Sequence, residues 1–158
     1  MKSLKSVLRV FGVFLSMMVV LSGCGSSAEE VRAAQVLAIC NEANLALSVL
    51  TTDEIVPSYS ADWSQIQDIY SGIKSKLQDL SSQASDLDET QLARDFSSIS
   101  KNAGEIEAVA SFTVLMGGSR AASDNVIRSS WLDAVNKLTK NEALRSPSDR
   151  TFIGCKSN

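Results

Sequence analysis

The chain has 158 residues, with 15 basic and 18 acidic side chains, three cysteines and no histidine. The lack of histidine excludes Ser-His-Asp hydrolases, Cys-His proteases and histidine zinc sites, and three cysteines are too few for a four-thiolate zinc site. The excess of acidic residues argues against a nucleic-acid partner.

The first 23 residues are typical of an export signal. Lys2, Lys5 and Arg9 precede a mostly apolar run of 12 residues over 10–21, whereas a membrane-spanning helix needs about 20. A basic start, a short apolar middle and small residues after it indicate a secretory signal peptide. Its removal leaves 12 basic and 18 acidic residues, a net charge of −6, in 135 residues. A chain of that size can form one domain with its own core.

The end of this signal is more specific. Leu21-Ser22-Gly23-Cys24 resembles the lipobox of bacterial lipoproteins at all four positions. The resemblance implies cleavage between Gly23 and Cys24, attachment of diacylglycerol to the Cys24 thiol, and acylation of the new amino terminus. Two or more acyl chains hold a protein stably on a bilayer. We therefore expect a lipid-anchored protein of the bacterial cell envelope, with residues 24–27 as a short tether. The resemblance covers residues 1–24 alone.

The mature region, 28–158, reads as an all-α domain. Apolar residues recur at spacings of three and four, which predicts helices over about 28–50, 62–85, 89–116 and 119–141. No stretch alternates strictly enough for a sheet. Long helices with short connections predict an up-down-up-down four-helix bundle. The predicted core stripes are Ala33, Val36, Cys40, Ala43, Leu47 and Leu50; Ile66, Tyr70, Ile73, Leu77, Leu80 and Ala84; Leu92, Phe96, Ile99, Ala103, Ile106 and Ala110; and Ile127, Trp131, Ala134 and Leu138.

Local signals support these boundaries. In a capping box, a side chain at the helix start and one three residues later satisfy each other's backbone donors. The candidate boxes are Ser27 with Glu30, Asp62 with Gln65, and Asp88 with Gln91. Gly117-Gly118 stands where a helix would end in a left-handed cap. The start of the fourth helix, near Ser119 or Ser123, has the weakest signal.

Cys40 and Cys155 are the two cysteines without lipid, and export would place them in an oxidising compartment. The 14 residues from Asn141 to Cys155 can span up to about 46 Å, so a tail after the fourth helix can reach Cys40. We predict a structural disulfide between them, with Phe152 and Ile153 buried along the way. The alternatives are two buried free thiols, or an unpaired, reactive Cys155.

The sequence offers no nucleophile–base pair and no set of metal ligands, so we expect no enzymatic activity, no metal and no cofactor. Gly117-Gly118-Ser119-Arg120 is read as a tight turn rather than a phosphate cradle, since no P-loop lysine accompanies it. An aromatic pocket for a small apolar ligand is an alternative to a simple aromatic core. Its residues would be Trp63, Tyr70, Phe96, Phe112 and Trp131.

The anchor suggests where a partner would bind. Lipid on Cys24 would hold the start of the first helix near the membrane, so the 51–61 link and the Gly117-Gly118 turn would share the far end. Ile55, Val56 and Tyr59 are apolar for an exposed link. They either contact a partner or fold over the bundle end. The leading hypothesis is a lipid-anchored helical protein that acts by contact with another envelope protein. The alternatives are a carrier of a small apolar ligand and a surface exclusion or immunity lipoprotein.

Overall fold

The computed structural model describes residues 27–48, 62–144, 152, 154 and 155. The helices are α1 (Ala28–Ser48), α3 (Trp63–Asp86), α4 (Thr90–Leu115), the short 3-10 helix η2 (Gly118–Ser123) and α5 (Asn125–Thr139). Within these residues the only β-type pairing is an isolated bridge between Leu144 and Phe152. The all-α prediction, with four long helices and a tail tied back to the first, is confirmed.

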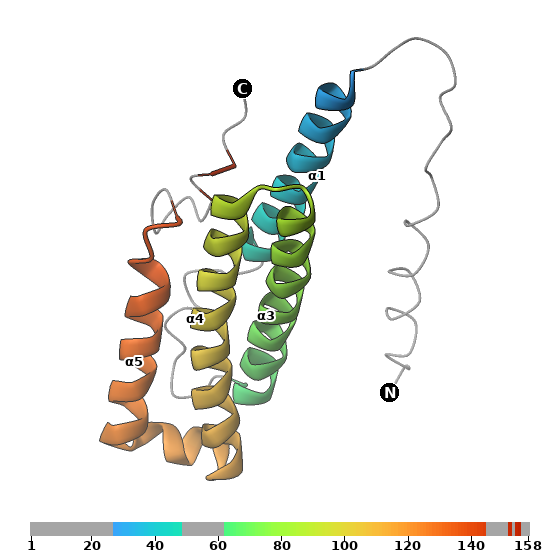
Figure 1. The fold of residues 1–158 in the computed structure, drawn as a ribbon. Coiled ribbons are helices and arrows are strands. Elements are labelled where there is room, and N and C mark those ends of the chain that lie inside the picture. The colour runs from blue at the N-terminus through green and yellow to red at the C-terminus, as the bar shows by residue number, and fades with distance from the viewer. Residues whose placement is uncertain (1–26, 49–61, 145–151, 153, 156–158) are drawn as a thin grey trace, which may run out of the picture.

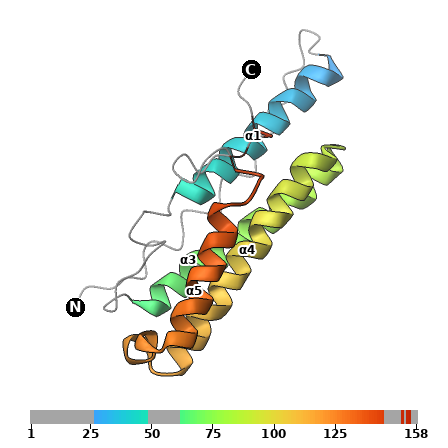
Figure 2. The same cartoon turned by 90° about the vertical axis from the view of Figure 1, so that its left-hand side faces the viewer.

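The helices lie roughly parallel to one long axis, and each runs opposite to the one before it (Figure 1). α4 packs against both α3 and α5, and α1 packs against α3. Figure 2 shows that α1 is shifted along the axis, so that its first turns project beyond the turn that joins α3 to α4. The molecule is therefore an offset bundle, with α1 overhanging one end and the α4–α5 connection at the other.

The core of α3, α4 and α5 follows their predicted stripes. Every predicted stripe residue on these three helices is buried. Trp131 of α5 meets Trp63 and Tyr70 of α3 edge to face, with ring centroids 5.1 and 6.2 Å apart. This is the preferred geometry for aromatic rings, whose positive edges face negative faces. These three aromatic side chains pack against one another in the core.

The stripe predicted for α1 is confirmed only in part. Cys40, Ala43 and Leu47 are buried, and so is Ile39, which was not predicted. Ala33 is exposed, so its placement in the core was wrong. The reason is the offset: Ala33 lies in the overhanging turns of α1, where the spacing of apolar residues continues but the neighbouring helices have ended. Val36 is half-buried at the boundary, and Leu50 lies outside the described residues.

Two of the three predicted capping boxes mark real helix starts. Ser27 donates its backbone N–H to Glu30 at 2.9 Å, and Glu30 donates its own to the Ser27 hydroxyl at 3.3 Å. The Asp62 carboxylate accepts from the backbone N–H groups of Ser64 and Gln65 at 3.1 and 3.2 Å. Each bond satisfies a donor that the first helical turn leaves without an intrahelical partner.

The capping box predicted at Asp88 was wrong, and α5 begins beside Ser123, the later of its two predicted starts, rather than at 119. Asp88 adopts a left-handed backbone with φ 59°, so the chain is still turning there and Glu89 becomes the N-cap of α4, without a side-chain capping bond. α5 does not begin at 119: Asp124 caps it by accepting from the backbone N–H groups of Val126 and Ile127. The residues between form η2, after Gly117 and Gly118 take the predicted left-handed conformation, with φ 107° and 64°.

Candidate functional site

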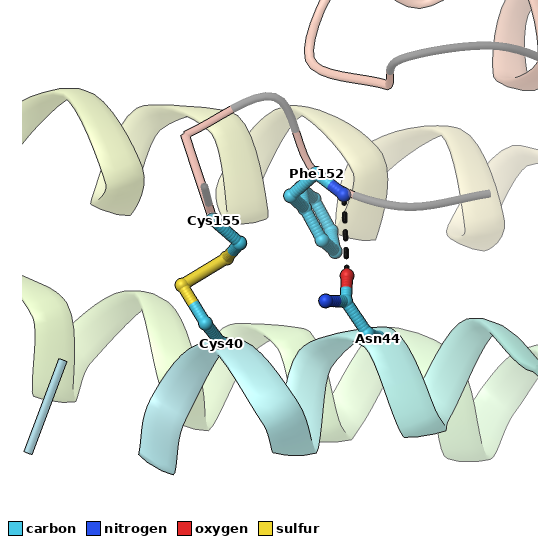
Figure 3. Close-up of a disulfide and its surroundings, with 4 residues drawn as sticks. All are labelled: Cys40, Asn44, Phe152 and Cys155. Atoms are coloured by element: carbon cyan, nitrogen blue, oxygen red, sulfur yellow. Dashed lines mark hydrogen bonds between the residues drawn. A yellow bond between two sulfur atoms is a disulfide. The ribbon is translucent and has the colours of Figure 1, made fainter. Parts of the chain in front are cut away.

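The tail is joined to α1 by a disulfide between Cys40 and Cys155, whose Cα atoms are 5.3 Å apart. Figure 3 shows both cysteines beside Asn44 and Phe152. Asn44 lies one turn after Cys40, and its Oδ1 accepts the backbone N–H of Phe152 at 3.2 Å. The predicted disulfide is confirmed. It closes a loop of about 115 residues, which in the chain-entropy model contributes about 4–5 kcal/mol to stability.

Phe152 gives this tail an anchor in the core. Its side chain is fully buried, and its ring meets that of Phe96 on α4 edge to face at 4.7 Å. The predicted burial of Phe152 is confirmed, whereas Ile153 lies outside the described residues. Phe152 thus bonds to α1 through its backbone and contacts α4 through its ring, so the tail occupies part of the core beside α1.

Ion pairs on the surface connect α4 to both of its neighbours. Glu107 accepts from Lys74 of α3 at 3.0 Å, and Glu105 accepts from Lys137 of α5 at 3.0 Å. Lys137 also pairs with Asp133 at 2.9 Å. Hydrogen bonds from Lys137 to Asp133 and then to Glu105 raise the pKa of Lys137 above that of an ordinary lysine. The two glutamates face opposite sides of α4 and do not form a paired-carboxylate site.

Large apolar side chains are exposed at the end of the molecule where α4 meets α5. Phe112, Leu115 and Met116 close α4, and Val126 lies in the first turn of α5; their exposed fractions range from 51% to 81%. We call these four residues the apolar end cluster. Figure 1 shows that this end is opposite the start of α1. Exposed apolar groups gathered at one place are a common mark of an interaction surface.

Several predicted site residues lie outside the described residues. These are Gly23 and Cys24 of the lipobox, and Ile55, Val56 and Tyr59 of the link. The predicted partner-binding residues are thus not described, but the end of the bundle where they were expected carries the apolar end cluster. Phe112 was predicted to lie with Trp63, Tyr70, Phe96 and Trp131 in the core or in a pocket. Those four side chains are buried, whereas Phe112 is exposed. Leu115, Met116 and Val126 were missed, because an apolar residue at a helix end gives no sign of which side it faces.

An open polar groove runs along the outer side of α3 and α4, near their connecting turn. Its lining is mostly hydroxyl groups, with one carboxylate and one guanidinium. The lining residues are Ser81, Ser82, Ser85, Asp86, Thr90, Ala93, Arg94 and Ser97. Ser81 at one edge donates to the Ala93 carbonyl at 2.8 Å and so ties the two helices together.

Within residues 27–48, 62–144, 152, 154 and 155, no helix is long and apolar enough to cross a membrane. The same residues contain no group of three or more cysteine, aspartate or glutamate side chains arranged to hold a metal ion. Comparison of the chain with models of protein families, with curated proteins and with solved structures gives no match. The case for a function rests on the chemistry of this chain alone.

Proposed function

We propose that this chain is a lipid-anchored protein of the bacterial cell envelope that binds another envelope protein through the apolar end cluster. The lipobox-like Leu21-Ser22-Gly23-Cys24 supports the anchor. Cys24 precedes Ser27 by three residues, which span at most about 11 Å. A lipid on Cys24 would therefore hold the end of the molecule where α1 begins.

The observation that carries the proposal is the position of the apolar end cluster. It lies at the end opposite the start of α1, where a membrane anchor would leave it directed away from the bilayer. Leu115 is 81% exposed, and burying an exposed leucine side chain contributes about 1.5–3 kcal/mol. Exposed apolar side chains at one end of the molecule can serve as the few buried anchors that supply most of the binding free energy of a protein–protein contact.

The anchor is tested by replacing Cys24 with alanine in the full chain. We expect the unmodified protein to stay with membranes after an alkaline wash and the Cys24→Ala variant to be released, because the wash removes proteins that lack an acyl or spanning anchor. Ser26→Ala, two residues away, serves as the control and should stay bound. Membrane association of Cys24→Ala equal to that of Ser26→Ala would contradict the lipid anchor.

The contact surface is tested by photo-crosslinking in intact cells. A photoreactive residue at Leu115 or Met116 should form a discrete adduct with a second protein. The matched control is position 101 of α4, where Lys101 is also exposed but lies halfway along the helix. Adducts of equal yield at all three positions, or no adduct at Leu115 and Met116, would contradict binding through the apolar end cluster.

A further inference from the structure

α1 has apolar residues on two opposite sides. Its inner side carries Ile39, Cys40, Ala43 and Leu47, which are buried against the bundle. Its outer side carries a second line of residues, spaced by three, four, three and four positions: Val31, Ala34, Ala38, Asn41 and Leu45. We call this line the outer stripe. All five residues are exposed, with Val31 at 47% and Leu45 at 68%.

Such a helix normally has both sides covered. A helix that faces water on one side carries polar residues there, whereas one that is apolar all round is buried in a protein or a membrane. α1 is too polar to cross a membrane, and its inner side is already packed on α3. The outer stripe therefore calls for a protein partner.

We infer that the outer stripe binds the outer stripe of a second copy of this chain, as a parallel pair of helices. Alternation of three and four is the spacing of a two-stranded coiled coil, in which each helix presents the same seam to its partner. Ala34 and Ala38 are small and permit a close approach of the two backbones. Leu37, beside the seam and 52% exposed, adds apolar area. Asn41 would lie in the seam opposite its copy, where the two side-chain amides can hydrogen-bond to each other.

The charges near the outer stripe favour this pairing. Glu42 is paired with Lys76 of α3, and Arg32 is paired with Glu89 at 2.9 Å. Glu30 is held by the backbone N–H of Ser27. These groups have partners within their own chain. A second helix can therefore pack on the outer stripe without burying an unpaired charge, and burying one would be destabilising.

The parallel orientation rests on the proposed lipid anchor, since copies anchored near the start of α1 would all point the same way. α1 has 21 residues, about 32 Å of helix, and its outer stripe, from Val31 to Leu45, provides only about two heptads of contact. A stable dimer in solution buries roughly 800 Å² on each partner, more than one face of a short alanine-rich helix offers. The pair would therefore be weak in solution and gain strength on a membrane, where tethering raises the effective concentration.

The test is thiol crosslinking of the full chain in bacterial membranes. An Ala38→Cys variant carries one unpaired thiol, since Cys40 and Cys155 are bonded to each other and Cys24 would carry lipid. A short bifunctional thiol reagent should give about tenfold more dimer at Ala38 than at Lys101→Cys, an exposed control on α4. A pair of Leu→Glu substitutions separates the two surfaces. Leu45→Glu in the Ala38→Cys background should abolish the dimer, whereas Leu115→Glu should leave it unchanged.

The outcomes distinguish this inference from the anchor. Membrane-bound protein that crosslinks at Ala38 no better than at Lys101, or whose dimer survives Leu45→Glu, overturns the pairing and leaves the anchor standing. Soluble protein with a dimer at Ala38 that Leu45→Glu abolishes supports the pairing and overturns the anchor. Soluble protein that gives no such dimer even at millimolar concentration, about the effective concentration that tethering supplies, overturns both. Circular dichroism of Leu45→Glu should match that of Leu115→Glu, since both leucines are exposed.

Discussion

The α3–α4 hairpin and α1 are held in the same bundle by different means. The hairpin has an unbroken line of buried residues on each helix, from Trp63 to Ala84 and from Leu92 to Thr113. α1 buries only the stretch from Ile39 to Leu47 and adds a disulfide to the tail. The hairpin is therefore held mainly by continuous apolar packing, whereas α1 combines a shorter buried stretch with a covalent bond to the tail.

Removing that bond should have the largest effect. Replacing both Cys40 and Cys155 by serine is expected to lower the free energy of unfolding by about 4–5 kcal/mol, because the unfolded chain regains the freedom of the closed loop. The free energy is measured by urea denaturation. Amide hydrogen exchange should rise first in α1, with α3 and α4 still protected. Equal loss of protection in all helices would contradict the difference between the two regions.

A pair of phenylalanine substitutions sharpens the comparison. Phe96→Ala removes a fully buried ring from α4 and should cost about 3–5 kcal/mol, with faster exchange throughout the hairpin. Phe152→Ala removes the ring that meets it, but from the tail. We expect a smaller loss of stability and faster exchange in α1, while α3 remains protected. A loss from Phe152→Ala that equals or exceeds that from Phe96→Ala would show that the tail belongs to the main core.

The smallest effects concern the helix starts. Asp62→Ala and Asp124→Ala each remove a carboxylate that accepts two backbone N–H groups, and each should cost about 1 kcal/mol. Glu89→Ala provides the control, because Glu89 occupies the N-cap of α4 without a capping bond. It loses only the exposed pair with Arg32, worth at most about 1 kcal/mol. Thermal unfolding should show a larger loss of stability for each aspartate variant than for Glu89→Ala, and the reverse would contradict the capping roles.

The sequence predicts the buried sides of α3, α4 and α5, but that of α1 only in part. The stripes of α3 and α4 repeat over six turns, so their buried sides follow from spacing alone. Ala33 shows the limit: spacing tells which side of a helix is apolar, but not where the neighbouring helix ends. Asp88 shows another, since the same residue types suit a helix start and a left-handed turn.

The candidate sites were predictable to different degrees. The disulfide between Cys40 and Cys155 follows from the number of cysteines and the reach of the tail. The apolar end cluster could not be predicted in this way. Phe112 and Leu115 lie in an apolar run, and which of its side chains are exposed depends on where α4 ends and on the path of η2. For the outer stripe of α1 the signal was present, in the spacing of Val31, Ala38 and Leu45, but the inner stripe of the same helix obscured it.

The disulfide between Cys40 and Cys155 also has a consequence for resistance to proteolysis. The two cysteines enclose nearly the whole domain, from α1 to the tail. If one peptide bond between the two cysteines is hydrolysed, the disulfide still joins the two fragments. A single cleavage within this segment would therefore not release either fragment from a lipid on Cys24. Release would require a second cut, or reduction of the disulfide.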